Sequence, residues 1–211
     1  MRSPHFLDPV TSSDRNWRVA VVCGGTSAER EISLQSGAAV IAALHGRGHL
    51  VRAIDPLYQP VREVDWNRFD VAFLALHGTV GEDGVIQRQL DSLGVPYTGS
   101  DAESSALAFH KVSAKVRFQQ AGLPTPPWIP IREVTQPICD RIARQLGFPV
   151  AIKPVAQGSS LGVTIVRERA ELPIACERAL SYSEEGLAER AIPGEEWTVS
   201  LLDDEILGAI H

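Results

Sequence analysis

The sequence predicts an α/β protein whose first half contains a parallel sheet and whose end contains antiparallel strands. Short β-branched runs alternate with segments of helical periodicity between residues 17 and 98, which is typical of a parallel sheet covered by helices. Two glycine-rich segments directly follow strand candidates, at the edge where such sheets bind ligands. Toward residue 211, apolar runs follow one another without helices between them, which indicates antiparallel pairing.

The first strand candidate is residues 17–23, WRVAVVC, a β-branched run that Gly24 and Gly25 end. A helix follows, because apolar residues recur at intervals of three and four until Gly46: Leu34, Ala38, Ile41 and Leu44. The other elements of this half are strands at 49–54, 70–76 and 96–98 and a helix at 83–93. Residues 1–16 lack periodicity, and we expect a disordered tail there.

The character of the sequence changes at Ser104, where a helix is predicted over 104–120. The proline-rich connector at 122–127 is stiff, and a strand at 128–131 follows it. The remaining predicted elements are helices at 139–146 and 170–182 and strands at 149–153, 163–167, 187–192, 197–202 and 206–210. A turn at 203–204 joins the last two strands, and the final runs are expected to pair antiparallel.

Composition excludes several classes of protein. Of 211 residues, 44% are hydrophobic and 22% charged, and the net charge of -6 argues against a nucleic-acid partner. Cys23, Cys139 and Cys176 lie far apart, which predicts three free thiols in a reducing cytoplasm. The longest apolar run, 71–76, is too short to span a membrane, and charged residues interrupt the N-terminus where a signal peptide would be apolar. We therefore expect a cytoplasmic protein.

The first segment that could carry chemistry is the turn after residue 23, Gly24-Gly25-Thr26-Ser27-Ala28-Glu29-Arg30-Glu31. A glycine-rich turn between a strand and a helix can bind an anion, but this one has neither GxGxxG nor GK[ST] spacing. Taken alone, it is more readily interpreted as a tight turn whose serine and glutamate cap the helix. The carboxylate of Glu29 is unusual at such a position, because it favours an ammonium ligand.

Two further glycine-rich segments follow later strands. In residues 76–84, LHGTVGEDG, His77 lies at a strand end among three glycines, which favours a ligand contact, while Glu82 and Asp83 are expected to cap the next helix. The loop after Lys153 suits polyphosphate binding, although a polar hairpin loop explains it as well. Lys111 and Lys115 share one helix face and are typical of a solvated pair.

Together these segments resemble the ATP-grasp superfamily and, within it, the D-alanine–D-alanine ligases. The residues that carry the resemblance are GGTSAEREISLQSG (24–37), LHGTVGEDG (76–84), GVPYTGS (94–100), KVSAK (111–115), AGLPTPPW (121–128), FPVAIKPVAQGSSLGV (148–163) and IPGEEWTV (192–199). The resemblance implies an N-terminal Rossmann-like α/β domain at 17–103, a central ATP-grasp subdomain at 104–188 and a truncated start of the C-terminal ATP-grasp subdomain at 189–211. One residue departs from the pattern, His110, where the family leads us to expect an aspartate.

The resemblance also implies roles for individual residues. Glu29 would hold the ammonium group of the first D-alanine, Ser159 would hydrogen-bond in the same subsite, and His77 would help to orient that substrate. Lys111 and Lys153 would contact ATP phosphates, while Lys115 would remain solvated. The other residues implied in nucleotide binding are Gly158 and Ser160 in the loop that encloses the phosphates, Glu189 and the backbone through Ile192 beside the adenine, and Glu196 at the ribose.

The implied activity is that of an ATP-dependent, ADP-forming carboxylate–amine ligase, which joins two D-alanine molecules through an acyl phosphate for peptidoglycan synthesis. The cofactor set would be ATP with Mg²⁺, and the metal ligands and a phosphoryl-stabilising arginine are expected beyond His211. We therefore predict that the 211 residues alone bind ATP poorly and do not turn over. A ligase for D-lactate or D-serine and a non-catalytic binding protein are the alternatives, and the resemblance favours a homodimer.

Overall fold

A computed structural model describes residues 15–203 and 205–211, so the predicted tail at 1–16 lies almost entirely outside the described residues. The chain divides into two compact units. The first runs to Ala114 and includes the short segment Ala156–Ser159, and the second contains Lys115–Val155 and Ser160–His211. Each unit is described separately below.

The first unit is built on a parallel sheet, as predicted. Its strands β1 (Arg18–Val22), β2 (Leu50–Ile54) and β3 (Val71–Leu74) lie in the order β2-β1-β3. The strand predicted at 96–98 is reduced to a single parallel bridge between Tyr97 and Ala72. Pro96 has no N–H to donate, and Gly99 with φ of +96° turns the chain away, so pairing ends there.

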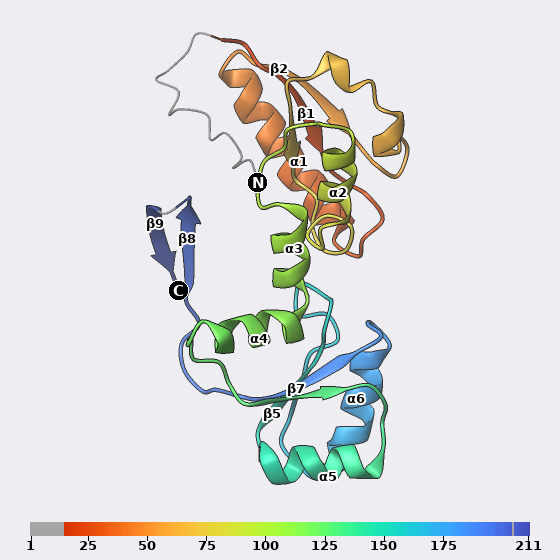
Figure 1. Ribbon diagram of the computed structural model, residues 1–211, viewed down its shortest axis with the longest axis vertical. Helices are drawn as coiled ribbons and strands as arrows, with labels where there is room; N and C mark the ends of the chain where they lie inside the picture. The colour runs from red at the N-terminus through yellow and green to blue at the C-terminus, as the bar shows by residue number, and fades with distance from the viewer. Residues whose placement is uncertain (1–14, 204) are drawn as a thin grey trace. The chain divides into compact units, whose positions relative to one another are not determined.

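Helices cover both faces of this sheet because successive strand residues point to opposite sides. Val19, Val21 and Cys23 pack with apolar residues of α1 (Arg30–Gly46) on one face. The intervening Ala20 and Val22 belong to a second cluster with α2 (Val85–Ser92) and with the segment that carries the short 3₁₀ helices η1 (Val61–Glu63) and η2 (Trp66–Arg68). Figure 1 shows α1 lying along the sheet.

The single helix predicted over 104–120 is wrong, because the structure has two helices there. α3 (Ala102–Phe109) is capped by Asp101, whose carboxylate accepts from the Ser104 N–H at 2.7 Å. His110 leaves the helical conformation with ψ of 97°, and α4 (Lys111–Gln120) begins after it. The Nδ1 atom of His110 accepts from the Ser113 N–H at 3.2 Å, so this histidine performs the capping that an aspartate would perform.

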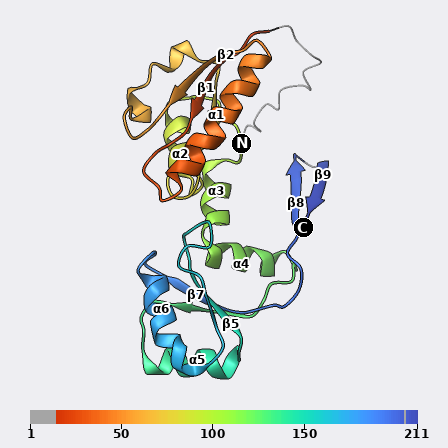
Figure 2. The same ribbon diagram turned by 180° about the vertical axis from the view of Figure 1, so that it is seen from behind.

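The second unit contains a four-stranded antiparallel sheet with the order β4-β7-β5-β6. Its strands are β4 (Trp128–Ile131), β5 (Val150–Pro154), β6 (Thr164–Val166) and β7 (Gly186–Arg190). α5 (Gln136–Gln145) and α6 (Leu172–Leu180), which follows the 3₁₀ helix η3 (Arg169–Glu171), bury their apolar residues against one face. Figures 1 and 2 show α4 and α5 on opposite sides of β5 and β7.

The last strands form a separate hairpin of β8 (Thr198–Leu202) and β9 (Glu205–Ile210), antiparallel as predicted. The preceding run at 187–192 does not join them, because both edges of β7 are occupied by β4 and β5. Cys23, Cys139 and Cys176 are buried free thiols, as predicted. No helix among the described residues is long and apolar enough to cross a bilayer.

Candidate active site

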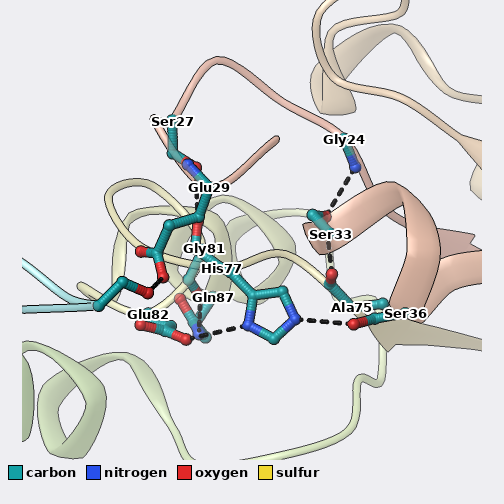
Figure 3. Close-up of polar contacts among 11 residues, drawn as sticks. Gly24, Ser27, Glu29, Ser33, Ser36, Ala75, His77, Gly81, Glu82 and Gln87 are labelled. Atoms are coloured by element: carbon teal, nitrogen blue, oxygen red, sulfur yellow. Dashed lines mark hydrogen bonds and ion pairs between the residues drawn. The ribbon is translucent and has the colours of Figure 1, made fainter. Parts of the chain in front are cut away.

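Ser33 of α1 fixes the loops that leave β1 and β3. Its side chain is fully buried, and its hydroxyl accepts from the Gly24 N–H at 2.8 Å and donates to the Ala75 carbonyl at 2.7 Å (Figure 3). Gly24 and Gly25 both have positive φ, 88° and 75°, which glycine adopts without strain. The carboxyl ends of two neighbouring strands are therefore tied to one buried hydroxyl.

An arginine–aspartate pair holds the same turn from its other side. Arg30 donates to the Gly25 carbonyl at 2.8 Å and contacts the Asp55 carboxylate at 2.7 Å, and Asp55 accepts from the Gly25 N–H at 3.0 Å. Burial works to raise the pKa of Asp55, but the Arg30 guanidinium and two backbone N–H groups outweigh it and hold that pKa below its usual value. The charged form of Asp55 is thus part of the turn.

Glu29 stands at the N-cap position of α1, but its side chain does not cap that helix. Instead, its Oε1 atom accepts a hydrogen bond from the Ser159 hydroxyl, so residues far apart in sequence meet within the first unit. Its Oε2 atom is buried and has no hydrogen-bond partner. Gly158 and Gly78 leave room for this carboxylate, since a Cβ on Gly158 would lie 2.9 Å from Oε2. The capping interpretation of Glu29 is therefore wrong.

His77 follows β3 and is held at both ring nitrogens (Figure 3). Nε2 lies 3.0 Å from the Ser36 hydroxyl of α1, and Nδ1 lies 3.4 Å from the Glu82 carboxylate. Its backbone carbonyl accepts from the Ser27 hydroxyl at 2.7 Å. The capping role predicted for Glu82 is thus wrong, whereas Asp83 accepts from the Val85 N–H at 3.0 Å and holds the start of α2.

A cavity of about 200 Å³ lies at the carboxyl ends of β1 and β3. Its walls come from the two glycine-rich loops, from the segment after β2 and from α2, and they include Gly24, Gly25, Thr26, Ser27, Arg62, His77, Thr79 and Gln89. This is the edge at which parallel α/β sheets bind ligands. Glu29 and Ser159 do not line this cavity, although Ser27 and His77 from the same loops do. The cavity and the Glu29 carboxylate are therefore separate features of one loop cluster.

The segment before Ser159 also carries a lysine contact. Lys111, at the start of α4, donates to the Gln157 carbonyl at 2.5 Å. Gly158 follows directly, and Ser159 has φ of 47°. Ser160, which belongs to the second unit, is exposed and has φ of 56°. The structure therefore brings Glu29, Ser159, Gly158 and Lys111 into one loop cluster of the first unit.

The second unit contains a cluster of two lysines and one glutamate. The Glu189 carboxylate on β7 contacts Lys153 of β5 and Lys115 of α4, each at 2.5 Å. Burial works to raise the pKa of Glu189, but the two ammonium groups outweigh it and hold the pKa below its usual value. The solvated role predicted for Lys115 is wrong, because its side chain is 6% exposed and also donates to Thr125 at 2.6 Å.

Ile192 and Glu196 follow β7 in the connection to β8, where both side chains are exposed. Ser33, Ser36 and Lys115 are residues that sequence reasoning missed as parts of these clusters. The one available signal was Glu189, a carboxylate that follows the apolar residues Leu187 and Ala188 in a predicted strand and favours a positive partner there. Within the described ranges, no three His, Cys, Asp or Glu side chains group so as to hold a metal ion.

Comparison with known proteins agrees with these features. A family model of the D-alanine–D-alanine ligase C-terminus matches residues 117–211, and a model of the N-terminus of the same ligases matches residues 55–100. The D-alanine–D-alanine ligase of Azoarcus sp. strain BH72 is 45% identical over 194 residues, which cover 92% of this chain and 63% of that protein. The ligase of Geobacter sulfurreducens is 43% identical, with 92% and 61% covered.

Solved structures give the same result. The crystal structure of D-alanine–D-alanine ligase from Bacillus anthracis matches with a TM-score of 0.81 and 35% identity, over 92% of this chain and 63% of that one. A structure of the Bacillus anthracis ligase complexed with ATP matches with a TM-score of 0.77 and 32% identity, over 92% and 65%. This chain spans about 63% of the length of the first of these relatives. The predicted resemblance is confirmed, and the chain belongs to the D-alanine–D-alanine ligase family.

Proposed function

We propose that the protein to which this chain belongs is a D-alanine–D-alanine ligase, which joins two D-alanine molecules at the expense of ATP in peptidoglycan synthesis. The observation that carries the proposal is the Glu29 carboxylate, whose Oε2 atom is buried without a partner beside Ser159. A buried carboxylate oxygen without a hydrogen bond is costly, and an ammonium group would supply the missing donor. A D-alanine carries such a group.

The residues have distinct tasks in this proposal. Glu29 binds the ammonium group of the first D-alanine, Ser159 holds the carboxylate of Glu29 in place, and His77 orients the substrate. The tie between Ser36 and the His77 ring at 3.0 Å supports this last task, because a ring held at both nitrogens keeps one orientation. The substrate carboxylate is then free to attack the γ-phosphoryl group of ATP.

Nucleotide binding falls to two lysines, to the loop at 158–160, and to β7 with the segment that follows it. Lys111 and Lys153 contact its phosphates, and the loop with Gly158 and Ser160 encloses them. Glu189, Ile192 and Glu196 border the adenine and ribose. Phosphoryl transfer depends chiefly on positioning and on stabilising charge, which ammonium groups and backbone N–H groups supply.

The reaction proceeds in two steps. The carboxylate of the first D-alanine attacks the γ-phosphorus, ADP leaves, and an acyl phosphate forms. The amine of the second D-alanine then attacks the acyl carbon, loses a proton, and expels inorganic phosphate. The acyl phosphate must be kept from water between the two steps, and the loop at 156–162, rich in glycine and serine, is suited to cover it.

Steady-state kinetics of the Glu29→Gln variant of the whole protein to which this chain belongs test the proposal, with Glu31→Gln as the matched control because Glu31 is an exposed glutamate of the same helix. We expect the KM for the first D-alanine to rise by about tenfold or more, which corresponds to losing one charged hydrogen bond of about 1.5–3 kcal/mol. The KM for ATP should change little. Equal losses for D-alanine and ATP, or an equal effect of Glu31→Gln, would contradict the assignment. Binding of D-alanine with no phosphate release would instead identify a binding protein.

A further inference from the structure

Lys115 is a buried lysine for which the proposed reaction has no task. Its side chain is 6% exposed, and its ammonium group contacts Glu189 Oε2 at 2.5 Å and Thr125 Oγ1 at 2.6 Å. A buried ammonium group is costly unless a counter-charge and hydrogen bonds compensate for it. Thr125 supplies one of these contacts and the carboxylate of Glu189 supplies the charge.

The same carboxylate also holds a second lysine. Glu189 Oε1 accepts from Lys153 at 2.5 Å, and the Lys153 side chain is 28% exposed. β5 and β7 are antiparallel neighbours in which Glu189 pairs with Ala151, two residues from Lys153, so both side chains stand on the same face of the sheet. This is the face opposite to the one that α5 and α6 bury. The more exposed end of the cluster is therefore Lys153.

The three side chains together carry one net positive charge. If Lys115 were neutral, Glu189 and Lys153 would form a closed pair without net charge, and the carboxylate would repel any anion that approached Lys153. With Lys115 present, the carboxylate is already neutralised from its buried side. The positive charge that is left resides at the half-buried Lys153, the more exposed of the two lysines, where an anion can reach it.

We propose that Lys115 is a positioning residue for nucleotide phosphates, which neutralises Glu189 and thereby leaves Lys153 its positive charge. The inference rests on the proposed function, because it assumes that Lys153 meets phosphate. In this proposal Lys115 does more than hold α4 on the sheet, because its charge keeps Lys153 available to an anion. Charge at position 115, and not only a hydrogen bond, must then matter.

Titrations of the whole protein to which this chain belongs with ADP and with adenosine, followed by ¹H–¹⁵N NMR, test this because they detect binding without turnover. We expect Lys115→Met to weaken ADP binding by about tenfold or more, the effect of removing one nearby unit charge at an effective dielectric constant of about 20. Adenosine, which carries no phosphate, should bind both proteins alike. Thr125→Val, which removes a hydrogen bond but no charge, is the matched control and should bind ADP like the wild type.

The decisive variant is Lys115→Met combined with Glu189→Gln. It removes both charges, so the cluster again carries one positive charge. Because Glu189 also borders the adenine in the proposed function, the readout is the ratio of ADP affinity to adenosine affinity, which should return to within about threefold of the wild-type ratio. If Lys115→Met does not fold, Lys115→Gln replaces it in both proteins, since a neutral amide still donates to Glu189 and Thr125.

Two results would overturn the inference alone: unchanged ADP binding in the Lys115 variant, or an equal loss for ADP and adenosine that Glu189→Gln does not restore. The latter would mean that Lys115 only holds α4 on the sheet. A whole wild-type protein that shifts with neither ADP nor adenosine would overturn the proposed nucleotide function as well. A chain that binds adenosine but not ADP would overturn the assignment of phosphate to Lys153 and, with it, the inference.

Discussion

Replacing Ser33 by alanine tests whether one buried hydroxyl joins the loops that follow β1 and β3. The side chain is fully buried, and its hydroxyl lies 2.8 Å from the Gly24 nitrogen and 2.7 Å from the Ala75 oxygen. A methyl group at this position can neither donate nor accept. Both backbone groups would then lose their partner in a place that water does not reach.

The magnitude follows from these two contacts. Leaving a buried donor or acceptor unsatisfied costs about 1–3 kcal/mol, so the two groups together cost about 2–6 kcal/mol. Alanine is the better helix former, which returns about 0.5 kcal/mol because Ser33 lies inside α1. We therefore expect Ser33→Ala to lower the free energy of unfolding of the first unit by about 2–5 kcal/mol.

Urea denaturation followed by tryptophan fluorescence measures the change, and hydrogen exchange at the Gly24 amide assigns it to the loop. Ser92→Ala is the matched control, because Ser92 is an exposed helical serine whose hydroxyl bonds only to the Gln89 carbonyl. The control should change stability by less than about 0.5 kcal/mol. A Ser33→Ala variant as stable as the control, with Gly24 exchange unchanged, would refute the reasoning.

Two further substitutions have expected outcomes. Gly78→Ala should destabilise the protein by more than Gly94→Ala in urea denaturation, because both glycines have similar positive φ, 68° and 65°, but only at Gly78 would a Cβ meet the Glu29 carboxylate. Equal losses would mean that backbone strain alone, about 1–2 kcal/mol, accounts for both. Asp70→Asn should flatten the fall in stability between about pH 4 and pH 2, since the Arg18 side chain and N–H hold the pKa of Asp70 at about 2. A carboxylate whose pKa is lowered in the folded protein stabilises the fold at any pH above its pKa in the unfolded chain. This stabilisation is lost as the pH falls through its pKa in the folded protein. An unchanged pH dependence in urea denaturation at about pH 5 and pH 3 would contradict this.

Local sequence patterns predicted most of the elements because their causes are local. The run that became β1 and the amphipathic spacing of α1 are both read within one segment of chain. His110 shows where such reading fails. Its neighbours favour helix, and only the hydrogen bond from the Ser113 N–H to its ring ends one helix and starts the next.

The candidate site was predictable only to the extent that its motifs are local. The positions of Glu29 and Ser159 in glycine-rich loops were visible, but the contact between them depends on the fold. Lys115 was misread because its burial depends on Glu189, a residue much later in the chain. Its spacing from Lys111 gave no sign that the two lysines contact different partners.

The place of β7 in the second sheet has a consequence for the order of folding. β7 is the last of the four strands to be synthesised, yet it lies between β4 and β5. Until it emerges from the ribosome, β4 has no strand to pair with, while the β5–β6 hairpin can already form. Closing such distant pairs is slow and leaves apolar surface open to aggregation in the meantime. The same strand brings Glu189, so Lys115 and Lys153 acquire their shared counter-ion only in the step that completes the sheet.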